Sequence, residues 1–402
     1  MHKQESLPLS EVERPARALD NTRVVDMTRV LAGPWATQLL ADLGADVIKI
    51  ERPAAGDDTR SWGPPWFQAQ RGQRESAYFV CTNRGKRSLA VDIAEPRGAA
   101  LVGTLAAEAD VFVENFKVGD LKRYGLDYAT LAVRNPRLVY CSITGFGQEG
   151  PYADLPGYDF IAQAMGGIMS LTGDPNGSPV KTGVALTDIM TGLYACNGIL
   201  AALAQRERSG RGQHVTTCLL DVQIATLANQ ASSYLATQRN PPRMGNAHPS
   251  IVPYQSFRSA DGLIAIGVGN DSQFHQLCRV LDASELTRDG RFTTNAARVE
   301  HREALIPLLQ SAFMRSSSRH WITQLTNAGV PVGPVNTLAD VFADPHVTEC
   351  RLQMAMPHSH LGSVPGVACP VRLSDSPPRT DLGPPVLDEH GEQIRQRLWQ
   401  PV

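Results

Sequence analysis

Two aspartates each lie between a glycine-bearing loop and an apolar segment with helical spacing. Asp159 falls in Pro-Gly-Tyr-Asp-Phe, and Asp188 falls in Leu-Thr-Asp-Ile-Met. A carboxylate in the first turn of a helix caps free N–H groups and interacts favourably with the helix dipole. The same field favours its ionised form, which is the nucleophilic one. Spacing alone favours the capping role for Asp188, and both roles stay open at this point.

Basic and aromatic residues gather at the expected junctions between strands and helices. They are Lys49, Arg52, Arg60, Arg84, Lys86, Arg87, Asn115-Phe116, Lys122 and Arg123. Loops at the carboxyl ends of parallel strands are where a phosphorylated ligand binds, and Arg forks match phosphate oxygens. Each residue alone is typical of a solvated surface, but the cluster predicts a site for an anionic ligand.

Composition and missing motifs exclude several classes of protein. The net charge of -2 argues against bulk electrostatic binding of nucleic acid. The chain has no Walker-type loop, no G-x-S-x-G elbow and no H-E-x-x-H pair. His358 and His360 lack a nearby third ligand, so we expect no metal.

Cysteine spacing and hydropathy indicate a compartment. Seven scattered cysteines with no C-x-x-C pair are typical of reduced thiols in a cytoplasmic protein. The first twenty residues lack the apolar run of a signal peptide. No stretch has the length expected of a membrane-spanning segment, so we expect no contact with a membrane.

The elements that must position these residues alternate between strand and helix. Short buried strands are predicted at 23–27, 47–51, 89–93, 111–114 and 138–143, with helices between them. This alternation predicts an α/β fold with a mainly parallel sheet. Long helices follow at about 187–208 and 215–238. A hairpin at 254–258 and 263–268, followed by helices around 273–281, 302–314 and 320–328, predicts a smaller α+β unit.

These patterns divide the chain. We expect, in chain order, a flexible tail at 1–21, the first part of a large domain at 22–210, a helical linker at 211–242, a small α+β domain at 243–330, and a return linker with the C-terminal part of the large domain at 331–402.

A series of ordered motifs resembles the class III CoA-transferases, the family of formyl-CoA transferase and carnitine CoA-transferase. The matching stretches are 29–34 (RVLAGP), 43–53 (LGADVIKIERP), 56–60 (GDDTR), 83–88 (NRGKRS), 111–116 (VFVENF), 142–148 (SITGFGQ), 157–159 (GYD), 186–188 (LTD), 209–213 (SGRGQ) and 329–335 (GVPVGPV). The resemblance implies a Rossmann-like large domain with a smaller domain, and two chains interlocked as rings in a homodimer.

The resemblance also implies roles for individual residues. Asp188 takes the position of the nucleophile, which carries the acyl group as a mixed anhydride and then CoA as a thioester. Asp159 takes the position of an auxiliary carboxylate. Acyl-CoA is the implied co-substrate, and no metal is implied. The positions that match the family's CoA contacts are Val30, Leu31, Ala32, Arg52, Asn115, Phe116 and Arg123.

Two further segments are similar to one branch of the family, the succinyl-CoA:glutarate (hydroxymethylglutarate) CoA-transferases. They are 57–65 (DDTRSWGPP) and 245–257 (GNAHPSIVPYQSF). We therefore expect dicarboxylic acids as substrates, with Tyr158, His248 and Ser250 near them. Leu31 stands where formyl-CoA transferases have Gln, which argues against oxalate and formate.

Two rival interpretations stay open. The α-methylacyl-CoA racemases share the fold and the Asp188 position, but place a His where this chain has Tyr158, whose free pKa of about 10 makes it a poor general base. A non-catalytic CoA-binding protein would keep the basic cluster and have no need of Asp188.

Overall fold

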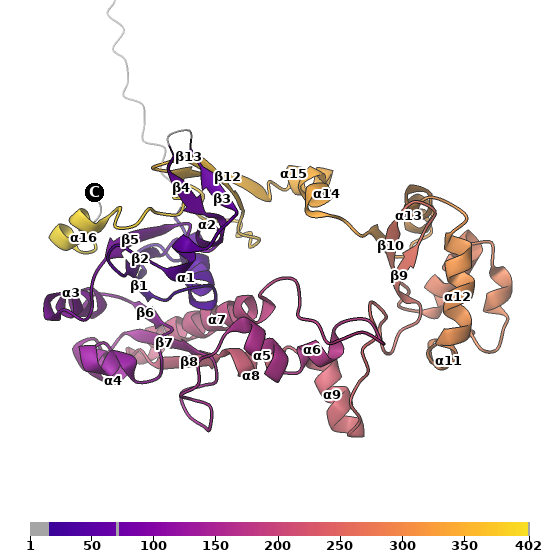
Figure 1. Ribbon diagram of the computed structural model, residues 1–402, viewed down its shortest axis with the longest axis horizontal. Helices are drawn as coiled ribbons and strands as arrows, with labels where there is room; N and C mark the ends of the chain where they lie inside the picture. Colours follow the sequence, from indigo (N-terminus) through magenta and orange to yellow (C-terminus); the bar gives the residue numbers. More distant parts are fainter. Residues whose placement is uncertain (1–15, 70–71, 401–402) are drawn as a thin grey trace, which may run out of the picture. The chain divides into compact units, whose positions relative to one another are not determined.

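The chain folds into two compact units, described from a computed structural model that covers residues 16–69 and 72–400. The first unit comprises Met1–Gly167, Thr182–Ala228 and Thr348–Val402. The second comprises Ile168–Lys181 and Asn229–Val347. Each unit has its own hydrophobic core, so each is described by itself (Figure 1).

The first unit is built on a six-stranded sheet with the order β5-β2-β1-β6-β7-β8. Its strands are β1 (Arg23–Met27), β2 (Asp46–Glu51), β5 (Lys86–Ala90), β6 (Val111–Glu114), β7 (Val139–Thr144) and β8 (His214–Cys218). All five neighbouring pairs are parallel. Because parallel strands need crossover helices, both faces of the sheet are covered. The predicted α/β class is confirmed.

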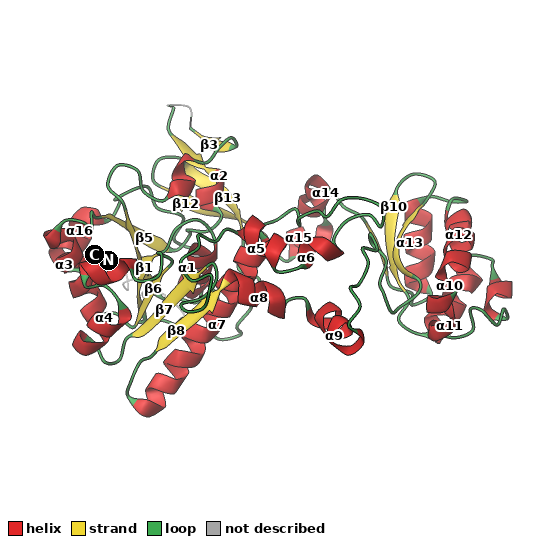
Figure 2. Cartoon of the chain, turned by 60° about the horizontal axis from the view of Figure 1, so that its bottom comes forward, coloured by secondary structure: helices red, strands yellow, loops and turns green. Residues whose placement is uncertain are grey.

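Helices pack on each face through alternating strand residues. On one face Val24, Val47 and Val139 contact α1 (Ala32–Asp42), α5 (Asp159–Met165), α7 (Leu186–Ser209) and α8 (Leu219–Ala225). On the other face Val25, Ile48 and Phe112 contact α3 (Pro96–Ala107), α4 (Tyr128–Arg134) and α16 (Gly391–Arg397). Figure 2 shows α7 and α8 beside β7 and β8. The result is a three-layer arrangement with the sheet in the middle.

The C-terminal segment returns to the edge of this sheet. Asp388 Oδ1 accepts a hydrogen bond from the backbone N–H of Ala90 at 2.8 Å, and His390 Nδ1 accepts one from Ser88 at 3.2 Å. Trp399 Nε1 donates to the carbonyl of Leu105 at 3.1 Å. The first two contacts satisfy the edge of β5, which would otherwise present unpaired N–H groups, and the third holds the segment to α3.

Smaller elements complete the first unit. They are η1 (Asp58–Ser61), β3 (Trp66–Gln68), β4 (Arg74–Ser76), α2 (Ala77–Val80), η2 (Asp120–Tyr124), β12 (Gln353–His358) and β13 (Gly362–Val367). The pairs β3–β4 and β12–β13 are antiparallel hairpins.

The second unit is an antiparallel sheet covered by helices. Its sheet has the order β11-β10-β9. The elements are α6 (Ile168–Leu171), α9 (Ala228–Thr237, at the border of the two units), β9 (Tyr254–Arg258), β10 (Leu263–Gly267), α10 (Asp271–Val280), η3 (Ser284–Thr287), α11 (Asn295–Glu300), α12 (Arg302–Phe313), α13 (Ser318–Asn327), β11 (Val332–Pro334), α14 (Leu338–Ala343) and α15 (Pro345–Glu349). Phe257, Phe274 and Phe313 lie in its core.

Helix α7 corrects one expectation from the sequence. With 24 residues it is long and apolar enough, by length and composition only, to cross a membrane. Its buried residues, among them Ala195, Ile199 and Ala202, belong to the core that α1 and the sheet share. The core helix of a globular protein passes the same length test, so α7 is explained by packing.

Two strands differ from the sequence-based expectation. The strand expected at 89–93 is β5 at Lys86–Ala90, because carboxylate partners in the folded chain neutralise the basic residues at its start. The expected helix at 215–238 begins with a strand instead: β8 pairs with β7, and α8 starts at Leu219. The β-branched residues of β8 suit a pleated surface better than a helix.

Candidate active site

A cavity of about 210 Å³ lies beside the N-termini of α1 and α7 in the first unit. Its wall brings together seven of the residues singled out from the sequence, namely Val30, Leu31, Ala32, Asn115, Phe116, Tyr158 and Asp188. A parallel sheet gathers the loops after its strands at one edge, and these residues come from such loops and from helix starts. The cavity is therefore the candidate active site.

Asp188 lies in the first turn of α7, and Asp159 caps that turn from another helix. One carboxylate oxygen of Asp159, Oδ1, accepts hydrogen bonds from the backbone N–H of Thr187 at 2.9 Å and of Asp188 at 3.3 Å. The residue before α7, Ala185, has no capping side chain. Asp159 thus satisfies N–H groups that a helix start leaves free.

Gln163 and Thr187 hold this arrangement from behind. The buried Gln163 donates to Asp159 Oδ2 at 2.7 Å and accepts from the backbone N–H of Thr182 at 2.9 Å. Thr187 Oγ1 donates to Gln223 Oε1 at 2.6 Å. The loop that enters α7 is fixed at several points, so the position of the Asp188 carboxylate is fixed with it.

The environment of Asp188 raises its pKa. The residue is 9% exposed, and within the described chain its carboxylate oxygens accept no hydrogen bond. Burial, reinforced by the nearby charge of Asp159, raises the pKa of Asp188 to about 7. The sequence argument, that the helix start keeps this carboxylate ionised, missed this effect because it left out burial. Asp159, which receives the backbone donors, is the cap.

A close approach of two glycines places Tyr158 and Asp159 against the end of β7. The Cβ of an alanine at Gly157 would lie 2.3 Å from the Cα of Gly145. At Gly145 the corresponding distance to the Cα of Gly157 is 2.5 Å. Both are far inside van der Waals contact, so only glycine allows the two loops to meet here.

The loop that carries Val30 is held from both sides. Asn115 accepts from the backbone N–H of Arg29 at 2.9 Å and donates to its carbonyl at 2.8 Å. Asp57 Oδ1 accepts from the backbone N–H of Val30 at 3.3 Å. Val30 has φ of 73°, a conformation that strains a β-branched residue. Strain of this kind persists where the surroundings fix the backbone, as they do here.

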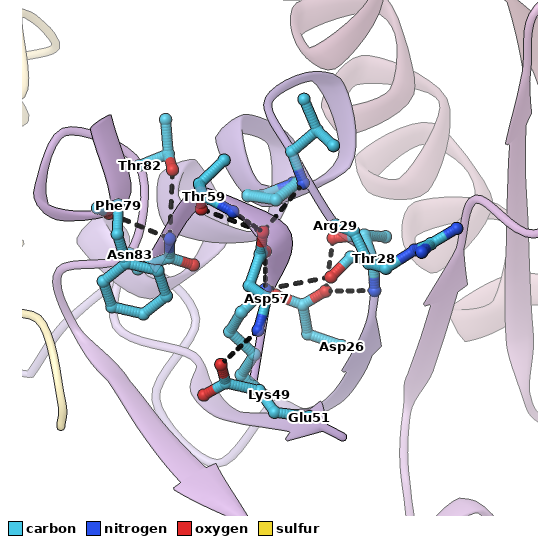
Figure 3. Close-up of polar contacts among 12 residues, drawn as sticks. Asp26, Thr28, Arg29, Lys49, Glu51, Asp57, Thr59, Phe79, Thr82 and Asn83 are labelled. Carbon is cyan, nitrogen blue, oxygen red and sulfur yellow. Dashed lines mark hydrogen bonds and ion pairs between the residues drawn. The ribbon is translucent and has the colours of Figure 1, made fainter. Parts of the chain in front are cut away.

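Beneath this loop lies a buried ionic network (Figure 3). Lys49 Nζ lies 2.9 Å from Asp57 Oδ2 and donates to the carbonyl of Thr28 at 2.9 Å. Lys86 Nζ donates to Asp26 Oδ2 at 3.0 Å and to Asn83 Oδ1 at 2.9 Å. Each ammonium group has several acceptors, which is the condition for burying a charge without a large penalty.

Most of the basic residues in the predicted cluster are held by such partners. Lys49 and Lys86 are fully buried in the network, Arg84 pairs with Asp42, and Arg87 pairs with Asp46. Arg60 forms two hydrogen bonds to Glu51. They stabilise the frame of the site. The sequence could not show this, because Arg84, Lys86 and Arg87 pair with residues 41 to 60 positions away and nothing in the sequence assigns the nearer partners of Lys49 and Arg60.

Arg52 and Arg123 line a second cavity of about 310 Å³. Arg29 and Phe116 line both this cavity and the first, so the two adjoin. Arg52 pairs with Asp58, and Arg123 lies 3.8 Å from Asp120, with both guanidinium groups largely exposed. An exposed guanidinium group can exchange such a surface partner for a phosphate.

His248 and Ser250 lie in the second unit. His248 Nδ1 accepts from the backbone N–H of Ser250 at 3.0 Å, and its ring lies 5.4 Å from that of Tyr254. His248 therefore orders its own loop. His358 accepts two backbone N–H groups, from His360 and Leu361. Across residues 16–69 and 72–400, no group of three or more potential metal-ligating side chains occurs.

Comparison with known proteins identifies the family. The model of CoA-transferase family III matches residues 19–391. The chain is 48% identical to a succinate–glutarate CoA-transferase of Agrobacterium fabrum, over 94% of this chain and 95% of the relative. It is 45% identical to the human succinyl-CoA:glutarate CoA-transferase, over 95% of this chain and 86% of the relative.

A solved structure shows the same fold. A CaiB/BaiF family protein from Brucella suis superposes with a TM-score of 0.85 at 50% identity, over 96% of this chain and all of that one. The family match, the relatives and the parallel sheet agree, and the chain therefore belongs to CoA-transferase family III.

Proposed function

We propose that this enzyme transfers CoA from succinyl-CoA to glutarate or a similar dicarboxylic acid, with Asp188 as the covalent nucleophile. The observation that carries the proposal is the position of Asp188. Its carboxylate is buried and accepts no hydrogen bond within the described chain, and the residue lines the cavity together with Val30, Leu31 and Ala32. The names of the relatives from Agrobacterium fabrum and Homo sapiens support the substrates.

The reaction proceeds in balanced steps. The Asp188 carboxylate attacks the thioester carbonyl, and the C–S bond breaks to give a mixed anhydride and CoA thiolate. The thiolate attacks the aspartyl carbonyl, releasing the donor acid and leaving an aspartyl-CoA thioester. The acceptor carboxylate attacks that thioester, and the returning thiolate then attacks the acceptor's acyl carbon and frees Asp188. Each intermediate stays activated, so the exchange needs no external energy source.

Charge that develops on the carbonyl oxygen needs hydrogen-bond donors. The first turn of α1 has no side-chain cap, and the N–H groups of Leu31 and Ala32 donate no hydrogen bond within the described ranges. Both residues line the cavity. These two N–H groups are our candidates for the oxyanion donors. The adjoining cavity with Arg52 and Arg123 would hold the phosphates of CoA.

A matrix of acyl-CoA donors and dicarboxylate acceptors tests the function. We expect exchange from succinyl-CoA to glutarate, and a loss of at least about a thousandfold in kcat for Asp188→Ala. Asp154→Asn is the matched control, because Asp154 is another carboxylate that lines the cavity. Hydroxylamine added with donor alone should modify Asp188. Deuterium uptake at the α carbon without an acceptor acid would instead indicate the racemase.

We also propose a homodimer in the cytoplasm. The contacting helices α5, α7 and α8 expose large apolar side chains, namely Phe160, Ile161, Met165, Leu193, Tyr194 and Ile224. An exposed apolar patch of this kind marks an interaction surface. Light scattering should give twice the monomer mass of 43.6 kDa, and a monomer at micromolar concentration would contradict the proposal.

A further inference from the structure

A hydrogen-bonded chain of three polar side chains, two of them buried and one partly buried, runs behind the wall of the cavities. Glu114 ends β6, Ser142 lies opposite it on β7, and His214 starts β8. The Ser142 hydroxyl hydrogen-bonds to the Glu114 carboxyl group, and Ser142 Oγ lies 2.9 Å from His214 Nε2. The parallel register places Ser142 opposite Glu114, whereas His214 lies opposite Tyr140 and reaches Ser142 diagonally across β7 and β8. The proposed mechanism uses none of them.

Aromatic rings fix His214 at the far end of this chain. Its ring stacks on Tyr128 at 4.8 Å and meets the edge of Tyr140 at 5.3 Å. The Tyr140 hydroxyl donates to the carbonyl of Leu126 at 3.0 Å. These contacts fix the plane of the imidazole, and Nε2 is the ring nitrogen that faces Ser142.

The near end of the chain holds the wall of the candidate active site. Glu114 Oε2 accepts a hydrogen bond from the backbone N–H of Phe116 at 2.8 Å. Phe116 lines both adjoining cavities, and Asn115 brackets the backbone of Arg29 on the opposite loop. Loss of the Glu114 contact would release the Asn115–Phe116 segment from one of its anchors.

The protonation of Glu114 is balanced near neutral pH. Burial raises the pKa of Glu114 to about 7, partly offset by its hydrogen bonds to Ser142 and Phe116. Burial also lowers the pKa of His214. Glu114, Ser142 and His214 line a small cavity of about 70 Å³. Its other charged or titratable groups are Lys117, Lys122, Asp127, Tyr128 and Tyr140. Cys141 lies on the same strand as Ser142, and its thiol stays protonated because burial raises its pKa.

We propose that Glu114 is a positioning residue for bound acyl-CoA, which holds the Asn115–Phe116 segment and exchanges its proton with His214 through Ser142. The proton leaves Glu114 for Ser142 Oγ as the Ser142 hydrogen moves to His214 Nε2, so no other reactant is needed. An ionised Glu114 binds the Phe116 N–H more strongly than a neutral one. The inference rests on the proposed function, because it takes these cavities as the CoA site.

Equilibrium binding of CoA, followed by calorimetry, tests the anchor. Glu114→Ala should weaken CoA binding about tenfold or more, since a charge-assisted hydrogen bond is lost. In turnover it should raise KM for acyl-CoA with a smaller change in kcat. Asp127→Asn is the matched control, because Asp127 lines the same small cavity and accepts a hydrogen bond from Thr130, whereas the Phe116 N–H bonds to Glu114. Melting curves establish that each variant is folded.

The pH dependence tests the proton exchange. Glu114→Gln keeps an acceptor for Phe116 but cannot ionise, so the ratio of its CoA dissociation constant to that of the wild type should rise between pH 6 and 8. Titration of the CoA phosphates and of Asp188 cancels in this ratio. Ser142→Ala removes a donor that stabilises ionised Glu114, so it should move the inflection to higher pH.

The outcomes separate the two proposals. If the wild type fails to bind CoA, the proposed function is wrong. If the wild type binds CoA while Glu114→Ala binds like Asp127→Asn, the anchoring role is overturned. The proton exchange is overturned if the ratio of the CoA dissociation constants of Glu114→Gln and the wild type does not change with pH. It is also overturned if Ser142→Ala leaves the inflection of the pH dependence in place. Both tests hold even where Glu114→Ala fails to fold.

Discussion

The carboxylate of Asp159 accepts a hydrogen bond from the backbone N–H of Asp188, whose own side chain lines the cavity. Asp159 therefore does for α7 what a capping residue at the helix start usually does. The side chain of Asp188 therefore does not cap the helix. The cost is a second negative charge near Asp188, which adds to burial in raising its pKa.

Asp159→Asn should shift the pH dependence of the reaction. Without the Asp159 charge the pKa of Asp188 falls below about 7, so the acid limb of kcat/KM moves to lower pH. The oxygen of the asparagine side chain still accepts the hydrogen bond from the backbone N–H of Thr187. Its NH₂ group, however, faces the NH₂ group of Gln163, and two donors cannot bond to each other. We therefore expect kcat to fall together with the pH shift. An acid limb that stays in place would show that Asp159 does not act on Asp188 through its charge.

Asp188→Asn should abolish activity and stabilise the fold at alkaline pH. The folded-state pKa of about 7 exceeds the unfolded value of about 3.9, so the wild type loses stability as pH rises between these values and does not regain it above them. The variant avoids this loss, so its gain in free energy of unfolding over the wild type should reach about 4 kcal/mol at pH 8 and vanish near pH 3. Urea unfolding at the two pH values measures the difference, and an equal effect at both would contradict it.

Lys86→Met should destabilise the first unit strongly. It removes the ammonium group from Asp26 and Asn83 and leaves a buried carboxylate with less compensation, at a cost of about 3–5 kcal/mol. Adding Asp26→Leu should recover part of that loss, because the uncompensated charge is then gone. Chemical denaturation of the single and double variants checks this, and a double variant weaker than the single one would argue against it.

Gly157→Ala should damage activity by displacing Tyr158 and Asp159. The new Cβ would meet backbone atoms of Gly145 at 2.3 Å, which cannot move away as a flexible side chain can. We expect kcat to fall about tenfold or more, since small displacements near reacting groups have effects of this size. Gly183→Ala, at a position with open space around it, is the control. Unchanged kcat in Gly157→Ala would mean that the two loops separate without consequence.

Sequence patterns predicted those parts of the molecule that depend on local order. The strands β1 and β6 have the expected bounds, and the long helix α7 lies within a residue of its prediction. Strand β5 begins three residues before its expected start, because Lys86 and Arg87 enter the strand paired with Asp26 and Asp46, which lie far away along the chain. The boundary between β8 and α8 was missed because both carry apolar residues at short spacing.

The site was predicted in part, for a similar reason. Ordered motifs identified seven residues that meet at one cavity, because loops after parallel strands converge. Asp57 and Glu114 lie within the matching motifs, but nothing there indicated that they hold the loops from behind, and Gln163 gave no signal beyond its polarity. The pKa of Asp188 was also out of reach, since burial depends on packing that spacing does not encode.

The return of the C-terminal segment to β5 sets an order for synthesis. The backbone N–H groups of Ser88 and Ala90 bond to His390 and Asp388, which leave the ribosome some three hundred residues later. Most of the second unit is one continuous stretch, Asn229–Val347, emitted before those partners. During translation the second unit can therefore fold while the edge of β5 is still unpaired, and this edge is then open to a chaperone that binds unpaired strand edges.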